Sequence, residues 1–298
     1  MMRATARWVI AGALCATLSA SVSHAIVWGV PDGDDHPNVG ALFIRFDPVF
    51  AVAPGVPAGV LPVCSGSVVA RQGNRALFLT AGHCLLPLAG GLAAFAALHP
   101  SVVVSFSGSL HDDLGVMIPV DMDALYAGHA QTSPPIGAFP DLEDIGLLVL
   151  EAEDEADVPE PVMLPWPGLL NALGSSGFRQ SVMRLVGFGD DITPPTPHRR
   201  ARVFGTRQVA HPNPVNLGEK YLMAQQNGHA GNSGAYFGDS GGPLFWVDPV
   251  TGDETLVAIV HGPVGNVTNE VAVVGQHYRI DAVNALTFID SVRVAEGF

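Results

Sequence analysis

The chain has 298 residues, which fits one large all-β domain or two small ones. Its 28 acidic residues outnumber its 14 basic residues, and the formal net charge of −14 argues against nucleic acid and anionic membranes as partners. The 34 glycines and 24 prolines favour many short strands joined by turns.

Residues 1–25 have the pattern of a secretory signal peptide. Two arginines among the first seven residues precede the apolar run Trp8–Leu18, which is too short to span a membrane because a span needs about 20 apolar residues. Small residues before the cleavage point predict cutting after Ala25, with cutting after Ala20 as the alternative. We therefore expect a secreted protein, extracellular or periplasmic, with no membrane attachment after cleavage.

Short segments that are alternating or continuously apolar predict the β-strands. In the first half of the chain they are Gly40–Phe46, Cys64–Ala70, Ala76–Ala81, Ser101–Ser107, Leu114–Val120 and Leu147–Leu150. In the second half they are Arg184–Gly189, Arg199–Val203, Tyr221–Ala224, Leu256–Val260 and a last strand that begins at Tyr278. A turn at Arg71–Asn74 predicts a hairpin, and Leu85–Leu98 could form either a short helix or the rim of a cleft. Asp281–Val292 has the apolar spacing of a helix, with Asp281 as its N-cap.

One short polar stretch raises the question of a metal site. It contains Asp32, Asp34, Asp35 and His36. We expect these side chains to be solvated rather than to bind an ion, and we expect the protein to need no metal and no cofactor.

The hexapeptide Gly238–Pro243, with Ser240 at its centre, has the composition that a nucleophilic serine requires. A serine hydroxyl needs a base beside it and donors that hold the negative charge that forms when it attacks. Gly238 and Gly241 add little bulk, and Gly238 can adopt a φ that most residues avoid. The N–H groups of Gly238 and Ser240 would then point into one small space, an oxyanion hole. The alternative is a glycine-rich turn with an incidental serine.

Two further motifs contain the partners that such a serine needs. His83 lies in Thr-Ala-Gly-His-Cys, and Asp144 lies in Asp-Ile-Gly-Leu-Leu-Val-Leu. Asp141 and Glu143 are neighbouring candidates, but Asp144 leads directly into the apolar strand. The order His, Asp, Ser along the chain is the chymotrypsin-type order. With these three motifs the chain resembles a serine protease of the trypsin/chymotrypsin family, of the secreted bacterial kind.

The resemblance implies an all-β fold with two six-stranded antiparallel β-barrels and a C-terminal helix. The first barrel would cover about residues 26–155, the second about 156–280 and the helix about 281–293. The acidic segment Glu151–Pro161 would connect the barrels.

The resemblance also assigns catalytic roles. Ser240 would attack the scissile carbonyl, His83 would take its proton, and Asp144 would hold the correct imidazole tautomer. Cys64 and Cys84 would form the disulfide beside the histidine. The predicted function is a secreted serine endopeptidase, expected to be a monomer, that acts on protein or peptide substrates. One alternative is a catalytically inactive or regulatory binding protein on the same fold, and another is a hydrolase of narrow specificity for esters or glutamyl peptides.

In this family the residue six before the serine lies at the base of the primary specificity pocket, and here it is Gly234. Glycine brings no charge, so we expect a neutral P1 residue. Gly262 or Pro263 would form one wall and Gly275 or Gln276 the other, and we favour Gly262 and Gln276. Separately, a histidine stands where a serine usually contacts the triad aspartate, unless the alignment is displaced by one residue; it is His261.

The mature chain would begin at Ile26, in a segment that resembles the N-terminus of activated family members. In those proteins the new terminal ammonium pairs with the aspartate before the serine, here Asp239, and this pair shapes the oxyanion hole. Trp28 stands where glycine is usual. If signal peptidase cuts after Ala25, no propeptide would need removing. The alternative is that Ile26 and Val27 merely form an edge strand.

Overall fold

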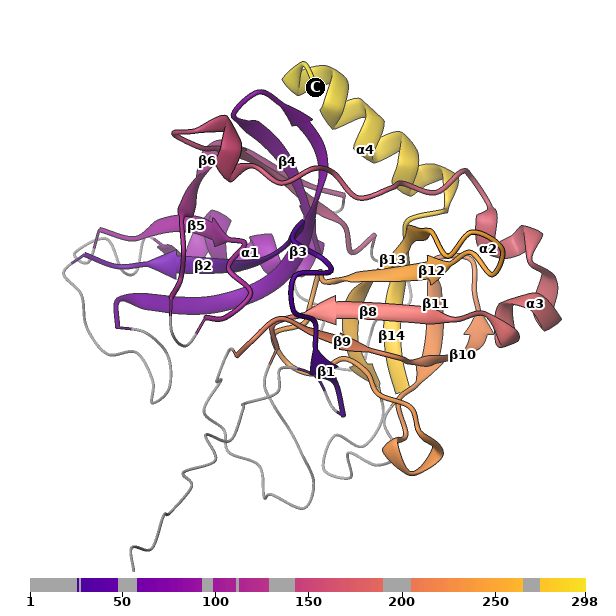
Figure 1. Cartoon of the computed structure of the whole chain (residues 1–298). Coiled ribbons are helices and arrows are strands. Elements are labelled where there is room, and N and C mark those ends of the chain that lie inside the picture. Colours follow the sequence, from indigo (N-terminus) through magenta and orange to yellow (C-terminus); the bar gives the residue numbers. More distant parts are fainter. Residues whose placement is uncertain are drawn as a thin grey trace, which may run out of the picture.

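The computed structural model describes residues 26, 28–47, 58–92, 99–110, 113–128, 143–189, 205–264 and 274–298 (Figure 1). The predicted signal peptide, the predicted strand Arg199–Val203 and the candidate Asp141 lie outside these residues. Within the described ranges, no helix is both long enough and apolar enough to cross a membrane.

Six antiparallel strands close the first barrel, in the order β2-β3-β4-β7-β6-β5. Their bounds are β2 Val39–Arg45, β3 Val60–Gln72, β4 Arg75–Thr80, β5 Ser101–Ser105, β6 Met117–Ala127 and β7 Gly146–Glu151. β3 and β4 form the predicted hairpin, with Gln72 opposite Arg75. β6 begins and ends later than predicted. β4 and β7 pair along their whole length and are almost entirely buried.

The second unit is an eight-stranded antiparallel sheet, in the order β1-β9-β8-β12-β13-β14-β11-β10. Its strands are β1 Val30–Pro31, β8 Met183–Gly187, β9 Gln208–Ala210, β10 Asn213–Leu217, β11 Tyr221–Gln225, β12 Pro243–Val247, β13 Glu254–Val264 and β14 Val274–Arg279. The last strand therefore begins before Tyr278, where the sequence placed its start.

The six inner strands of this sheet repeat the pairing of the first barrel. When each set is numbered along the chain, strand one pairs with two and with four, five pairs with four and with six, and six pairs with three in both units. The first barrel also pairs strands two and three, whereas among the described residues β9 and β11 do not pair and β10 lies beside β11 instead. The fold is thus the predicted chymotrypsin-like architecture, with edge strands β1 and β10 added to the second unit.

The N-terminal segment belongs to the second unit and not to the first barrel, which corrects the predicted boundary at residue 26. β1 pairs with β9, with Val30 opposite Val209. Ile26 is fully buried in an apolar cluster of the second unit that includes Leu222 and Val257. A two-residue strand carries too little pattern to be recognised in a sequence.

Helices lie outside the two sheets. They are α1 Gly82–Gly91, α2 Leu169–Ala172, α3 Gly174–Gln180 and α4 Val283–Glu296. α4 is the predicted C-terminal helix, but its N-cap is Ala282, so the prediction that Asp281 caps it is wrong. Asp281 is instead fully buried, where its carboxylate pairs with Arg279 at 2.8 Å and accepts a hydrogen bond from the Leu170 N–H at 2.9 Å.

A continuous apolar core joins the two units. The larger cluster of buried side chains fills the first barrel and includes Phe245 and Ile259 of the second sheet. α4 packs onto the same cluster through Val292, and Arg75 of β4 donates to Glu296 at 2.8 Å. Figure 1 shows α4 running from the second unit to the first barrel.

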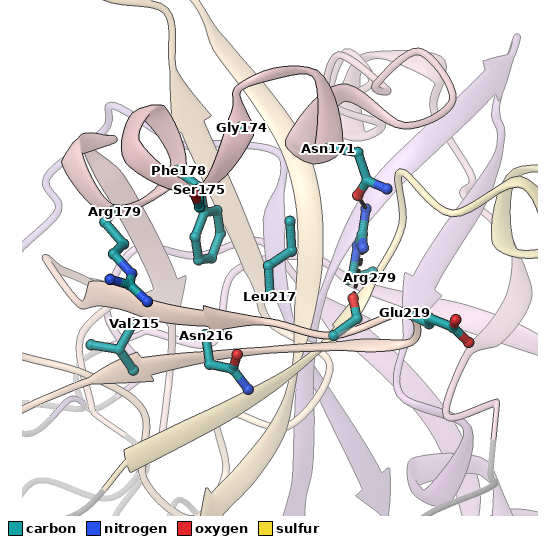
Figure 2. Close-up of a pocket in the computed structure, with 11 residues that line it drawn as sticks. Asn171, Gly174, Ser175, Phe178, Arg179, Val215, Asn216, Leu217, Glu219 and Arg279 are labelled. Atoms are coloured by element: carbon teal, nitrogen blue, oxygen red, sulfur yellow. Dashed lines mark hydrogen bonds between the residues drawn. The ribbon is translucent and has the colours of Figure 1, made fainter.

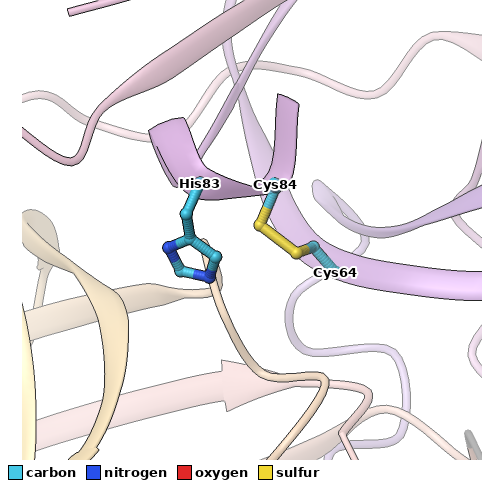
Figure 3. A group of neighbouring side chains, drawn as sticks. All are labelled: Cys64, His83 and Cys84. Atoms are coloured by element: carbon cyan, nitrogen blue, oxygen red, sulfur yellow. A yellow bond between two sulfur atoms is a disulfide. The ribbon is translucent and has the colours of Figure 1, made fainter. Parts of the chain in front are cut away.

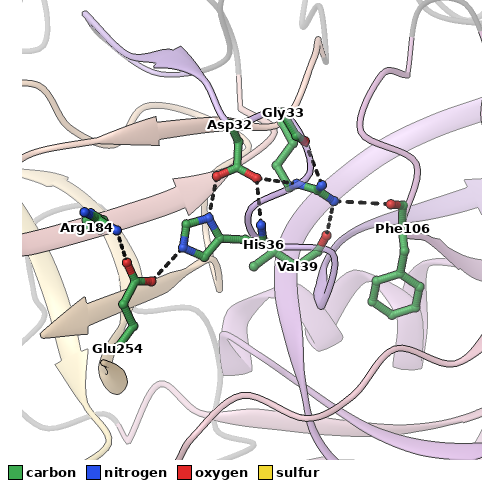
Figure 4. A network of polar contacts seen from close by, with 8 residues as sticks. Asp32, Gly33, His36, Val39, Phe106, Arg184 and Glu254 are labelled. Carbon is green, nitrogen blue, oxygen red and sulfur yellow. Dashed lines mark hydrogen bonds and ion pairs between the residues drawn. The ribbon is translucent and has the colours of Figure 1, made fainter. Parts of the chain in front are cut away.

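A buried polar network also joins the units, and its centre is His36 (Figure 4). Asp32 and His36 are only 5% and 8% exposed, so the prediction that they are solvated is wrong for these two residues. The Nδ1 of His36 contacts Asp32, and its Nε2 lies 2.7 Å from Glu254, which also pairs with Arg184. Arg207, 1% exposed, donates to Asp32 at 2.8 Å and to three backbone carbonyls. We call these five residues the His36 network.

The His36 network makes a testable contribution to stability. Burial alone would lower the pKa of His36, but the hydrogen bonds and charges of Asp32 and Glu254 outweigh it and raise the pKa to about 9. The stabilisation is therefore fully present below the unfolded value near 6.5 and is lost as pH rises through about 9. A shift of this size corresponds to about 3 kcal/mol.

We expect His36→Gln to lower the Tm at pH 6.5 and to lower it much less at pH 10. Calorimetry of both proteins across this range measures the difference. His211→Gln is the matched control because His211 is exposed, and it should give a small, pH-independent change. A His36→Gln deficit that stays constant from pH 6.5 to 10 would show that the charge of His36 contributes nothing.

A cavity with a volume of about 480 Å³ lies between α3 and β10 (Figure 2). Phe178 and Leu217 line it, together with Arg279. The guanidinium of Arg279 is already engaged by Asp281, by Asn171 and by a backbone carbonyl. None of the residues that line this cavity is a predicted site residue, so we do not assign the predicted reaction to it.

Candidate active site

Strands β4 and β7 bring His83 and Asp144 together. The strands are antiparallel, and Thr80 at the end of β4 pairs with Gly146 at the start of β7. His83 follows β4 and Asp144 precedes β7, so the two side chains meet at the same end of the strand pair. Gly82 suits this crossing because a Cβ at its position would lie 3.0 Å from a backbone carbonyl oxygen.

Asp144 holds both the backbone and the ring of His83. Its Oδ1 accepts a hydrogen bond from the His83 N–H at 2.8 Å, and the ring Nδ1 lies 3.1 Å from Oδ1 and 2.9 Å from Oδ2. The neighbouring Glu143 accepts a hydrogen bond from Asn284 at 2.7 Å. The structure therefore brings Asp144 to the histidine, as the sequence favoured.

A second imidazole contacts the same carboxylate. The Nδ1 of His261 meets Oδ2 of Asp144, so His261 occupies the position expected for the supporting serine and the alignment is not displaced. The pairing of β13 with β14 shifts between Val260 and Gly262, which makes His261 the extra residue of a β-bulge and turns its side chain toward Asp144. Its ring also lies edge-on to His83, with centroids 5.6 Å apart.

The charges of this cluster favour the ionic form of the His83–Asp144 pair. Burial by itself would raise the pKa of Asp144, but the charge of His83 and the hydrogen bonds of His261 and His83 hold it well below its usual range. Burial would lower the pKa of His83, but the charge and hydrogen bonds of Asp144 raise it above its ordinary value. Asp144 thus stays ionised at neutral pH and stabilises an imidazolium at His83, as a general base requires.

Ser240 lies against the helix that begins beside His83. Its carbonyl oxygen accepts a hydrogen bond from the backbone of β3 at 2.9 Å and lies 3.8 Å from the Sγ of Cys84. Gly241 packs so closely on Thr80 that a Cβ would lie 2.1 Å from the threonine hydroxyl oxygen. In the described structure no hydrogen bond joins the Ser240 hydroxyl to His83. Such bonds often tighten only when a substrate is bound.

The backbone around Ser240 has the pattern of an oxyanion hole. The N–H groups of Asp239 and Gly241 donate to backbone carbonyls at 3.2 and 2.8 Å. The N–H groups of Gly238 and Ser240 have no acceptor among the described residues, and Gly238 has a φ of +98°, as the sequence predicted. Two unused donors on either side of a used one are what a developing oxyanion needs.

Cys64 of β3 and Cys84 of α1 form the predicted disulfide (Figure 3). The bridge links the start of α1 to the barrel wall directly beside the His83 ring. Closing a loop of 20 residues stabilises a fold by about 3 kcal/mol in the chain-entropy account. The bridge therefore restrains the segment that carries the base.

Asp239 is fully buried beneath the serine loop. Its carboxylate accepts hydrogen bonds from the N–H groups of Gly189, at 2.7 Å, and Tyr236, at 2.8 Å. Ile26, its predicted partner, is also fully buried. In the uncut chain the Ile26 nitrogen is a peptide N–H that donates to Gln208 at 3.3 Å. An Ile26–Asp239 ion pair thus stays a prediction for the cut chain.

Trp28 adopts a backbone conformation that glycine adopts at lower cost. Its φ is +59°, where a non-glycine residue is strained by about 1–3 kcal/mol. Its indole packs onto Gly228, at which a Cβ would lie 2.3 Å from the indole nitrogen. The departure from glycine at this position is accommodated by that contact.

The predicted pocket residues are only partly brought together. A Cβ on Gly262 would have nothing within 4 Å, so Gly262 borders open space, as a cleft wall should. The prediction that Gln276 forms a pocket wall is wrong, because Gln276 lines a cavity with Met223 on the other face of β14. Gly275, the alternative that the sequence left open, faces Gly234, because alternate residues of a strand face opposite sides.

The polar group nearest Gly234 comes from Gln226, which the sequence gave no motif to identify. A Cβ on Gly234 would lie 2.1 Å from the Gln226 Oε1. An aspartate at position 234, the substitution that would create a trypsin-like pocket, therefore does not fit unless Gln226 moves. Ser65 was also missed: its hydroxyl donates to the Gly238 carbonyl and accepts from Phe188, each at 3.0 Å.

Two groups of side chains in the described structure have the spacing of metal ligands. His83, Asp144 and His261 have donor atoms within 4.8 Å of one another, and so do His83 and the two cysteines. The cysteines are joined in the disulfide and offer no thiolate. A cation in the first group would have to displace the hydrogen bonds between Asp144 and the two imidazoles.

No protein-family model matches the chain, and a comparison with curated proteins finds no significant match.

Proposed function

We propose that the protein is a secreted serine endopeptidase of the trypsin/chymotrypsin family. The observation that carries the proposal is the convergence of three features at one point. These are the His83–Asp144 pair, the adjacent Ser240, and the two unused N–H groups of Gly238 and Ser240. The fold supports the proposal because the closed barrel and the second sheet bring these features together from segments that are far apart in the sequence.

Each residue has a defined role in the proposed reaction. The Ser240 hydroxyl attacks the scissile carbonyl carbon while His83 accepts its proton, and the carbonyl oxygen takes negative charge in the oxyanion hole. His83 then gives the proton to the leaving amine, and a serine ester remains. Water attacks this ester with His83 again as the base, which releases the acid and restores Ser240. Asp144, supported by His261, holds the imidazole in the tautomer that these transfers need.

Covalent labelling tests the proposal. The protein beginning at Ile26 should react with a fluorophosphonate at one equivalent, on the tryptic peptide that contains Ser240. It should also cleave an unfolded protein substrate, and the label should block cleavage. Absence of both reactions would favour the second candidate, an inactive binding protein on this fold, to which the missing bond between Ser240 and His83 lends support.

Activation by the N-terminus is a further part of the proposal. If the signal peptide is removed after Ala25, the Ile26 ammonium can enter the site where Asp239 is buried, and export alone would produce active enzyme. Pairing should raise the pKa of the ammonium above its free value of about 7.7–8.0, so the pair is intact below that value and is lost as pH rises through the folded value.

We expect the secreted protein to begin at Ile26 and to lose activity reversibly in alkaline solution. N-terminal sequencing checks the first expectation. The pH dependence of activity checks the second. A chain with one additional alanine before Ile26 tests the cause, because its charge lies one residue away, and it should be at least about tenfold less active. Equal activity of the extended chain would show that the N-terminal charge is not used.

A further inference from the structure

A buried polar pair lies next to the serine loop and is not used by the proposed chemistry. Gln226, 1% exposed, donates through Nε2 to the Ala235 carbonyl at 2.9 Å, which fixes the orientation of the side-chain amide. Its Oε1 has no donor among the described residues. His277 is fully buried, and neither of its ring nitrogens has a partner in the described structure.

Both groups point toward the same space between two glycines. A Cβ on Gly275 would lie 2.8 Å from the Gln226 Oε1 and 2.8 Å from the His277 Nε2. A Cβ on Gly234 would lie 2.1 Å from the same Oε1. Because both positions are glycine, no side chain lies between the Gln226 acceptor and the His277 imidazole on this side of β14.

This space adjoins the nucleophile. Ala235, which holds Gln226, lies in the loop that leads to Ser240. His277 pairs with Val260, whose carbonyl accepts the N–H of Gly241, the residue after Ser240. A substrate side chain that enters between Gly275 and the serine loop would thus extend toward the polar pair.

The imidazole is uncharged at neutral pH. Burial, together with the charge of His261, lowers the pKa of His277 to about 3. The next residue of β14, Tyr278, faces the opposite side of the strand, where its ring contacts Tyr221. A neutral imidazole provides one N–H donor and one acceptor, and the Gln226 Oε1 provides an acceptor only.

We infer that this pair forms the floor of the specificity pocket and selects a primary carboxamide, the side chain of glutamine or asparagine, as the P1 residue. The inference rests on the proposed endopeptidase function. The substrate NH₂ would donate to the Gln226 Oε1, and the substrate carbonyl would accept from the His277 N–H. The Gln226 Oε1 and the N–H of His277 would then each have a partner.

Other P1 side chains complete the pair less well. A carboxylate places an acceptor and a charge against Oε1, and an ammonium or guanidinium buries a charge beside no carboxylate of the described pocket. An apolar side chain leaves both polar groups buried and unpaired. Each unpaired group costs about 1–3 kcal/mol, which is a factor of roughly 5 to 150 in kcat/KM.

Peptides that differ only at P1 test the inference on the chain beginning at Ile26. We expect kcat/KM for glutamine or asparagine to exceed that for methionine, leucine, glutamate, lysine and arginine by at least about tenfold. Gln226→Met and His277→Leu should each reduce the ratio of carboxamide to methionine cleavage by at least about fivefold. Using a ratio within one protein cancels any general loss of activity.

Gln225→Met is the matched control, because Gln225 is the adjacent amide in β11 and pairs with Val274. It should leave the ratio unchanged. A labelled, active enzyme that prefers an apolar, acidic or basic P1 residue would overturn the inference and leave the endopeptidase function standing. An unchanged ratio in both Gln226→Met and His277→Leu would do the same. Failure of fluorophosphonate labelling would overturn the function and the inference together.

Discussion

Replacing Ser240 with alanine is expected to lower kcat/KM by about a million-fold and to abolish fluorophosphonate labelling, while the fold stays intact. Loss of the nucleophile has an effect of this size in serine proteases because no other group can form the acyl-enzyme. The fold should tolerate the change because Ser240 is tied into the structure through its backbone carbonyl, and alanine keeps that carbonyl. Steady-state kinetics, labelling and the Tm measure the three expectations.

Ser176→Ala is the control for a serine that is exposed on α3. It should label and turn over at the rate of the unaltered protein. If Ser240→Ala still takes up one equivalent of label, another nucleophile carries the reaction and the site is misassigned. If Ser240→Ala unfolds, its Tm reports this directly.

The arrangement of the candidate site could be predicted because each part lies next to a strand with a strong local pattern. The inner residues of β4 and β7 are continuously apolar. His83 follows β4 and Asp144 precedes β7. Antiparallel pairing of two such strands brings the end of β4 next to the start of β7, and this does not depend on the rest of the fold. The serine loop was recognisable because its backbone needs glycine at two positions. Gly238 and Gly241 both have a positive φ, which other residues rarely adopt.

The polar interior was not predictable in the same way. Asp32 and His36 look like residues of a solvated turn, and they are buried only because Arg207 and Glu254, far along the chain, complete the network. Likewise, the buried polar atoms beside Gly234 and Gly275 come from Gln226 and His277, which belong to no local motif. Such contacts arise from the packing of the two units and leave no spacing in the sequence.

The strand register was the other feature that could not be predicted from the sequence. The sequence offered Gly275 or Gln276 for the pocket wall, and the choice between them depends on which face of β14 meets the serine loop. The bulge at His261 shifts the pairing by one residue, so that Gly262 lies opposite Gln276. A one-residue shift exchanges the two faces of a strand, and only the three-dimensional pairing decides it.

Asp144→Asn is expected to lower kcat by about 10⁴-fold without disturbing the fold. The asparagine amide can donate to the Nδ1 of His83, which favours the tautomer with its proton on Nε2. That tautomer cannot accept the proton of Ser240. The backbone hydrogen bond from the His83 N–H to Oδ1 can persist in the variant, so the segment should stay in place.

The pH dependence of the residual activity gives a second, independent readout. Asp144 raises the pKa of His83, and only neutral His83 can act as the base, so wild-type activity is lost as pH falls through that raised value. Without the carboxylate the pKa of His83 should fall, and the acid limb of the kcat/KM profile should move to lower pH. Glu143→Gln is the matched control, since Glu143 is the adjacent carboxylate and contacts Asn284 instead of the histidine. It should change kcat by less than about threefold and leave the acid limb in place. An equal loss in both variants would mean that the loop, and not the Asp144 carboxylate, supports His83.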